Sequence, residues 1–428
     1  MKKTLLEILH DEVKPALGCT GPISVAFATA EARRIIGGTP KSIKIIIDMN
    51  TYKNSIAVVT PGTPFRGVLE PACVGAFYGN AEKGMEVLKD MISPDEDFIR
   101  KFAIENAEVD IKWDYHGMGL YIDAVIETEL GIGHAIVAKE HDRVVLREKN
   151  GEIIYKDETF KLEDDSFDSR LPIRDYSVKE IYDFANNVPI NEIEFLNTAI
   201  EMNMKLSNAG MNEDMGSNFG KAISKLPGEK VYIKAKSLAA AASDARMAGK
   251  NLPAMSCAKS GNVGIAASLP LIPVAESLGC SREKLIRAIC VSYLMTIYLK
   301  SHIGRLSAMC ACAIAASIGV GTGCCLLMGM KINDVSRVIH NIIGSIGGTV
   351  CDGAKFGCAL KLSSAAGIAI ESSRIVENGC YIANGDGLIC YDVDETIAML
   401  GRIAAPGMVS ANEYMSNEII KRENSINK

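Results

Sequence analysis

The spacing of apolar residues changes along this chain of 428 residues. In the first part, helix-like repeats of three and four positions are mixed with the two-residue alternation of strands. From about Val178 onward, helical patterns rich in alanine, glycine and serine dominate. This predicts an α+β fold with two domains: a mixed α/β N-terminal domain with antiparallel strands, residues 1–175, and a mainly α-helical domain, residues 176–428.

Two helices are expected near the N-terminus. A short amphipathic helix places four apolar residues on one face, namely Leu5, Ile8, Leu9 and Val13. A longer helix begins at Thr20, tolerates Pro22 in its first turn, and ends at the glycine pair Gly37-Gly38.

Strands are expected after these helices. Ser42–Asp48 and Ile56–Val59 are short apolar runs, and the second ends at the turn Pro61-Gly62. Three further strands are predicted for the segments GLYIDAVIETE, HAIVAKEH and RVVLRE. The pair Asn150-Gly151 follows the last segment and predicts a tight hairpin, because Asn-Gly suits a type I′ turn.

Charge and hydropathy exclude several classes of function. The formal net charge is −6 and no run of lysine and arginine occurs, so neither nucleic acid nor a membrane surface is an expected partner. Charged residues interrupt the first apolar run, which argues against a secretory signal. Residues 306–330 carry no charge, but their small side chains indicate a helix packed inside the protein rather than a membrane span. We expect a cytoplasmic protein.

Thirteen cysteines are present, which in a reducing compartment favours metal binding or catalysis over a disulfide framework. Cys310 with Cys312, and Cys351 with Cys358, form two distant groups. Thiolates from separate loops are the ligands that an iron–sulfur cluster requires, although this spacing alone is only suggestive. Most of the others are expected to be small core residues, including Cys73, Cys290, Cys324, Cys325 and Cys390.

Cys19 directly precedes the helix expected from Thr20. A helix N-terminus stabilises an anion and lowers the pKa of a thiol. Cys19 is therefore either a thiolate that acts as metal ligand or base, or an ordinary cysteine in a turn. His134, in a predicted strand, is either an acid–base group or a structural histidine.

Polar side chains gather in two further loops. Asn50, Lys53 and Asn54 follow a predicted strand, a common place for substrate-binding residues. Ser260 and Asn262 precede an apolar run, which suits carboxylate binding at a helix N-terminus. Taken singly, the first loop fits a solvated polar turn better, and the second fits a plain capping loop better.

Several segments, in order along nearly the whole chain, resemble the L-cysteine desulfidase family, which is also described as serine dehydratase α-chain-like. These segments are PALGCTGP, NTYKNSIAVVTPGT, GHAIVAKEH, DARMAGKNLP, KSGNVGI, IGRLSAMCAC and CDGAKFGCALK. The resemblance implies an oxygen-sensitive 4Fe-4S cluster in the helical domain, with the first domain serving substrate binding and catalysis. It also implies a lyase that converts L-cysteine to sulfide, ammonia and pyruvate.

The resemblance also implies roles for individual cysteines. Cys351 and Cys358 look like two cluster ligands, and either Cys310 or Cys312 looks like the third. We choose Cys310, because its spacing to Cys351 is nearer that in the iron–sulfur L-serine dehydratases, which the chain resembles more distantly. Cys19 resembles a family cysteine that closes the fourth iron site or acts on the substrate.

For such a lyase, a base must remove the α-proton of the amino acid while the β-substituent leaves. The candidate bases are Cys19, Lys53 and His134. The candidate substrate contacts are Thr20, Asn50, Asn54, Ser260 and Asn262.

One segment departs from the family. This chain has SCAKSGN where family members tend to have SNSGSGN, so Cys257 and Lys259 differ, and Lys259 can alter the choice of substrate. Three other interpretations stay open: an L-serine or L-threonine dehydratase with the same cluster, a non-catalytic cluster or zinc protein such as a sensor, and a pyridoxal-phosphate enzyme. The small-residue helices fit packing within one subunit or within a homo-oligomer.

Overall fold

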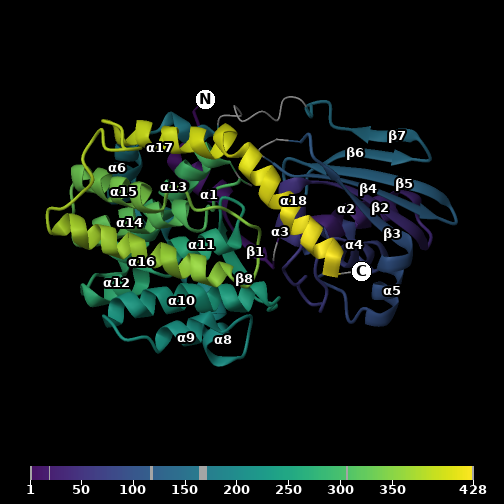
Figure 1. Cartoon of the computed structure of the whole chain (residues 1–428), viewed down its shortest axis with the longest axis horizontal. Coiled ribbons are helices and arrows are strands. Elements are labelled where there is room, and N and C mark those ends of the chain that lie inside the picture. Colours follow the sequence, from purple (N-terminus) through teal and green to yellow (C-terminus); the bar gives the residue numbers. More distant parts are fainter. Residues whose placement is uncertain (1, 19, 116–118, 163–170, 305–306, 427–428) are drawn as a thin grey trace.

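The computed structural model describes residues 2–18, 20–115, 119–162, 171–304 and 307–426. Figure 1 shows a sheet with its helices on one side of the molecule and a larger bundle of helices on the other. The predicted fold class is confirmed: a mixed α/β N-terminal part is followed by a mainly helical C-terminal part.

The N-terminal part is built on a six-stranded sheet with the order β3-β2-β4-β5-β6-β7, in which only the β2–β3 pair is parallel. Its strands are β2 (Pro40–Asp48), β3 (Ala107–Lys112), β4 (Tyr121–Thr128), β5 (Gly131–Ala138), β6 (Val144–Lys149) and β7 (Glu152–Lys156). Its helices are α2 (Thr20–Ile36), α3 (Met49–Ser55), α4 (Leu69–Tyr78), the 3-10 helix η1 (Ala81–Glu86) and α5 (Glu96–Asn106).

Alternating burial along the strands explains the layering. The inward residues of β2 and β4 share one apolar cluster with α2, α4 and α5. Gly133 on β5 faces α2 so closely that an added Cβ would lie 2.1 Å from the Ala32 carbonyl oxygen. The predicted hairpin is also confirmed, since Asn150 and Gly151 both have positive φ (52° and 84°) between β6 and β7.

The C-terminal part packs its helices around α13 (Arg282–Ile303) and α14 (Ile314–Met328). Its other helices are η2 (Pro172–Asp175), α6 (Val178–Asn187), α7 (Ile190–Ile193), α8 (Leu196–Asn212), α9 (Phe219–Ser224), α10 (Lys230–Met247), α11 (Gly261–Ser268), α12 (Leu271–Ser277), α15 (Ile332–Ile346), α16 (Cys358–Glu377), α17 (Val393–Arg402), η3 (Ile403–Gly407) and α18 (Val409–Ile426).

Residues 314–328 of the uncharged segment form the buried helix α14, as the small side chains predicted. At Gly319 an added Cβ would lie 2.4 Å from the backbone oxygen of Ser292, so glycine allows α13 and α14 to approach closely. In the part of the chain that the structure describes, no helix is long and apolar enough to cross a membrane. Cys290, Cys324 and Cys325 lie in this core, and Cys73 is buried in the sheet part, as expected. Cys390, which was also expected in the core, is only half-buried.

Three elements join the two parts. β1 (Val13–Leu17) pairs antiparallel with β8 (Pro253–Cys257), and the apolar face of α1 (Leu5–Glu12) belongs to the core of the helical part. Helix α18 runs from the helical part toward α3 beside the sheet (Figure 1). The division of the chain at residue 175 stays a prediction.

One predicted strand is wrong. Ile56–Val59 follows helix α3 and forms a turn, in which only Val59 makes an isolated β-bridge, to Arg66. The helix begins directly after β2 because the Asp48 carboxylate accepts a hydrogen bond from the Thr51 N–H (2.9 Å) and caps the first turn. The same carboxylate accepts a second bond from the Tyr121 N–H (2.9 Å), which fixes this cap against β4.

Candidate functional site

A cavity of about 110 Å³ lies where the two parts meet. The sheet part lines it with the start of α2, with α3 and with His141, which follows β5. The helical part contributes α10, the start of α11, α13 and two cysteine-containing segments. The cysteines that line the cavity are Cys310, Cys312, Cys351 and Cys358.

Backbone pairing brings the two cysteine segments together. The Cys310 N–H donates to the Thr349 carbonyl (2.8 Å), and the Cys351 N–H donates to the Ala308 carbonyl (2.6 Å). Cys358 begins α16, and its thiol lies 3.7 Å from the Gly353 carbonyl oxygen. Residues distant in sequence therefore present their sulfurs to one cavity.

The Cys310 thiol is hydrogen-bonded with the thiols of both Cys312 and Cys351. The bond with Cys312 and burial raise the pKa of Cys310 to about 12. The bond with Cys310 and burial also raise the pKa of Cys351 well above its usual range. These thiols hold their protons unless a positive group compensates the thiolate charge, which is what the irons of a cluster supply.

The four thiols offer the kind of ligand that an iron–sulfur cluster takes. Among the described residues, no three His, Cys, Asp or Glu side chains converge closely enough to hold one metal ion. A zinc site needs such convergence, whereas each thiolate of a cubane cluster binds a different iron. Four cysteines that line one cavity could supply such thiolates.

The cavity is electropositive. Arg246 and Lys300 line it although both are buried, with exposed fractions of 5% and 3%. Lys259 and Lys361 add two further cations, and the described lining residues include no aspartate or glutamate. The N-terminal ends of α2, α11 and α16 also border the cavity, and helix N-termini favour anions. The cavity therefore suits thiolates and a carboxylate ligand.

Four of the predicted substrate contacts line this cavity together, and they are Thr20, Asn54, Ser260 and Asn262. Cys19 lies outside the described residues. Its chain neighbours do reach the site: Thr20 borders the cavity, and the Gly18 carbonyl accepts a hydrogen bond from Arg246.

Lys53 and Asn50 lie behind the cavity wall and do not line it. The Lys53 side chain is 1% exposed, and its Nζ donates to Asn412 Oδ1 (2.5 Å) on α18. The Asn412 amide donates in turn to Asn50 Oδ1 (2.9 Å). Burial lowers the pKa of Lys53. This polar chain ties α3 to the C-terminal helix.

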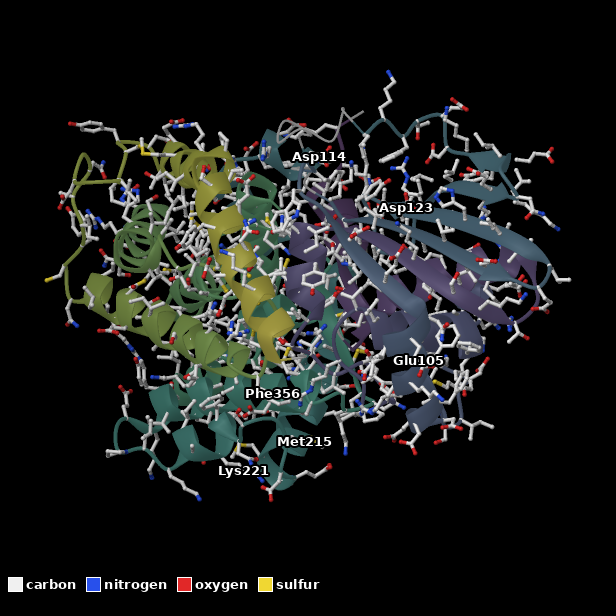
Figure 2. All side chains as sticks on the ribbon, turned by 45° about the vertical axis from the view of Figure 1, so that its right-hand side comes forward. Glu105, Asp114, Asp123, Met215, Lys221 and Phe356 are labelled. Carbon is white, nitrogen blue, oxygen red and sulfur yellow. The ribbon has the colours of Figure 1, made fainter. Side chains whose placement is uncertain are left out.

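His134 lies elsewhere, on the face of the sheet opposite α2. Its Nε2 is 2.9 Å from Asp123 Oδ1 and its Nδ1 is 3.3 Å from Glu148 Oε2. The hydrogen bond with Asp123 is the main cause that raises the pKa of His134. In Figure 2, Asp123 lies on the sheet, well apart from Phe356, which belongs to the loop before Cys358. The structure thus does not bring His134 to the cavity.

A strained turn places the start of α11. Ala258 and Lys259 both have positive φ (48° and 62°), and Cys257 and Ser260 exchange two backbone hydrogen bonds of 3.1 Å across them. Non-glycine residues in this conformation cost of order 1 kcal/mol each, and such strain is often found at functional sites. The buried Lys300 Nζ donates to the Ala258 carbonyl (2.7 Å) and so helps to hold the turn.

Sequence reasoning missed the buried cations. Arg246 lies in the DARMAGKNLP segment, and Lys300 lies within α13. Charged residues on helices are usually exposed, so their types gave no reason to place them at a cavity. For Arg246, the available signal was its position after the alanine-rich run AAAAS, where a charged side chain is unusual.

The fold and the cavity define an α+β protein with a cysteine-lined, electropositive site between its two parts. The profile of the serine dehydratase alpha chain family matches residues 82–415.

Three similar proteins are named UPF0597 proteins. That of Caldanaerobacter subterraneus is 36% identical over 99% of this chain and 100% of its own length. Those of Aeromonas hydrophila and Parabacteroides distasonis are each 36% identical, over 96% and 97% of this chain and 94% and 97% of their own. The chain belongs to the serine dehydratase alpha chain family.

Proposed function

We propose that this protein is an iron–sulfur lyase that eliminates the β-substituent of a small L-amino acid, with L-cysteine as the substrate. The observation that carries the proposal is the presence of four cysteines in one electropositive cavity that has no described carboxylate in its lining. This combination offers ligands for a cluster and a place for a substrate carboxylate. Membership of the serine dehydratase alpha chain family supports lyase chemistry.

In this proposal Cys310, Cys351 and Cys358 hold the cluster. Cys310 is favoured over Cys312 because its backbone is bonded to Thr349, in the segment that carries Cys351, and it is the more deeply buried of the two. Cys312 lies beside it and is the alternative third ligand. When bound through three thiolates, a 4Fe-4S cluster supplies an exchangeable iron position with Lewis-acid character toward the substrate.

The chain itself binds and orients the amino acid. Hydrogen-bond donors are available around the cavity. They come from the backbone at two helix N-termini, near Thr20 and Ser260, and from the side-chain amides of Asn54 and Asn262. A base takes the α-proton, the Cβ–S bond breaks, and its electron pair leaves with sulfide. The resulting aminoacrylate tautomerises and is hydrolysed, so that L-cysteine and water yield pyruvate, ammonia and hydrogen sulfide. We retain Cys19 as the proposed base, because Thr20 borders the cavity.

The proposal is tested by anaerobic purification, iron and sulfide analysis, and an assay of sulfide release from L-cysteine. We expect about four iron and four sulfide per chain, as in one cubane cluster, together with turnover. Cys358→Ser should lose both. Cys380→Ser, at an exposed cysteine in the same part of the chain, should keep both and serves as the control.

The assay also separates the possible substrates. Pyruvate release from L-serine at a much higher kcat/KM than sulfide release from L-cysteine would replace desulfidation with dehydration at the same site. A loaded cluster without turnover of any β-substituted amino acid would contradict the enzyme proposal. Failure to bind iron under reconstitution would contradict the ligand assignment.

A further inference from the structure

We infer that the Thr51 hydroxyl accepts a hydrogen bond from the α-amino group of the substrate, and so selects amino acids over acids that lack this group. The inference rests on the proposed function and deepens it, because it names a residue that recognises the substrate class. The sequence-based assignment chose Asn50, Lys53 and Asn54 from the same segment, and not Thr51.

Helix α3 divides the polar residues of this segment between two faces. Thr51 and Asn54 are three positions apart, so they share one face of the helix, and both line the cavity. Asn50 and Lys53 are also three positions apart, and both are hydrogen-bonded to Asn412 on α18. The helical spacing therefore brings Thr51 to the site in place of Asn50 and Lys53.

The Thr51 hydroxyl is buried without a partner. The side chain is 2% exposed, and among the described residues its Oγ1 makes no hydrogen bond. Its backbone is held on both sides, because the N–H donates to the Asp48 carboxylate (2.9 Å) and the carbonyl accepts from the Ser55 hydroxyl (2.8 Å). Buried polar groups in native proteins nearly always have a partner. A ligand in the cavity can supply the one that Thr51 lacks.

The two walls of the cavity differ in charge. In the described lining, all lysine and arginine side chains come from the helical part, namely Arg246, Lys259, Lys300 and Lys361. The sheet part contributes His141 and four neutral residues of α2 and α3, namely Thr20, Gly21, Thr51 and Asn54. Coulomb interaction with the lysines and arginine therefore orients a zwitterionic amino acid, with its carboxylate toward the helical part and its ammonium group toward α2 and α3.

The ammonium group needs oxygen acceptors on that neutral wall. The described residues that line the cavity include no aspartate or glutamate, so uncharged oxygens must take this role. A threonine hydroxyl has two lone pairs, and a hydrogen bond to a charged donor is stronger than one between neutral groups. Thr51 Oγ1 offers such an acceptor on the cavity face of α3.

The test compares L-alanine with propanoate, which has the same carbon skeleton but no amino group. Neither ligand has a leaving group, so calorimetry measures their affinity for the cluster-loaded protein whether or not sulfide is released from L-cysteine. Wild type should bind L-alanine about tenfold more tightly than propanoate, as expected for one hydrogen bond to a charged group. In Thr51→Val the affinity for L-alanine should fall by about tenfold, and that for propanoate should change by less than about twofold.

Two further variants test the hydroxyl itself. Thr51→Ser keeps the hydroxyl and should behave as wild type, whereas Thr51→Ala should lose the preference for L-alanine as Thr51→Val does. Thr322→Val is the matched control, because this buried hydroxyl donates to the Ile318 carbonyl (2.9 Å) on α14 and does not line the cavity. It should keep the preference for L-alanine.

Stability and kinetics separate ligand binding from a structural role. Thr51→Val loses no described hydrogen bond of the ligand-free protein, so its urea unfolding should match that of wild type. With L-cysteine, KM should rise by about tenfold while kcat stays within about threefold, since the amino group makes the same contact before and during the reaction.

Equal affinity of wild type for L-alanine and propanoate would overturn the inference, whether or not a variant folds. A folded Thr51→Val protein that keeps the preference, or that binds both ligands equally weakly, would also overturn it. If L-alanine binding depends on the hydroxyl but no β-substituted amino acid is turned over, the proposed function fails and the contact stands. If L-cysteine is turned over and the preference survives in Thr51→Val and Thr51→Ala, the function stands and the inference fails.

Discussion

At the scale of single residues, several charged side chains are buried at the cavity or directly behind it. Arg246 and Lys300 line the cavity while nearly excluded from solvent, and Lys53 is buried behind it against Asn412. His134, by contrast, lies between two carboxylates on the sheet. Two neighbouring carboxylates stabilise the protonated form of a histidine, and a protonated histidine suits a structural ion pair better than a general base.

His134 should make folding depend on pH. Because the pKa of His134 is raised in the folded protein, its stabilising contribution is complete below the unfolded pKa of about 6.5. It is lost as pH rises through the folded pKa. Urea unfolding should therefore show wild type more stable than His134→Gln at pH 6, by up to about 1 kcal/mol, and the difference should shrink at pH 8.5.

Asp123→Asn removes the main partner of His134 and should weaken the same pH dependence. Sulfide release per cluster should change less than about twofold in His134→Gln, since the residue does not line the cavity. A large loss of turnover with unchanged iron content would instead return His134 to the list of bases.

At the scale of elements, short connections shape the site more than the helices do. The bridge between Met309 and Val350 and the flanking hydrogen bonds set the two cysteine segments side by side. Between Cys351 and Cys358 the chain turns at Gly353, which has φ of 89° and packs against the backbone of α3. This loop thus couples the cysteines to the sheet part.

Gly353→Ala should disrupt cluster binding. An added Cβ would lie 2.2 Å from the Lys53 carbonyl oxygen, and the positive φ adds strain, so we expect a loss of roughly 2–4 kcal/mol in unfolding free energy. Iron content after reconstitution should fall by more than half. Gly357→Ala, where the nearest atom is 3.4 Å away on the flexible Lys355 side chain, is the matched control and should load normally. Equal iron content in both variants would contradict this role of the loop.

At the scale of the whole molecule, the cavity belongs to neither part alone. Its lining combines the start of α2 and residues of α3 with segments from α10 to α16, and β1, β8 and α18 connect the same two parts. A group bound in such a place stabilises the arrangement of both parts, since it binds only when both are folded and docked.

Loading of the cluster should therefore protect both parts together. Hydrogen exchange of reconstituted and iron-free protein should show slower exchange at the start of α2 as well as at the starts of α11 and α16. The β6–β7 hairpin, whose β7 strand is exposed and does not line the cavity, should exchange equally in both forms. Protection confined to residues 351–361 would contradict the shared site.

The sequence by itself determined the elements whose pattern is local. The apolar face of α1, the glycines that end α2 and the Asn-Gly turn of the β6–β7 hairpin depend on residues only a few positions apart. It also singled out Cys310, Cys312, Cys351 and Cys358, although their spacing was only suggestive of a cluster and their assignment as ligands came from the family resemblance. The strand predicted at Ile56–Val59 failed because the Asp48 cap starts a helix first.

Only the tertiary structure decided which polar residues share the cavity. Thr20, Asn54, Ser260 and Asn262 come together there, whereas Lys53 turns to Asn412 and His134 stays on the sheet. Arg246 joins the site through contacts with Gly18 and Asn262, which are distant from it in sequence. The physical reason is that periodicity depends on neighbours along the chain, while burial of a charge depends on the neighbours that packing supplies.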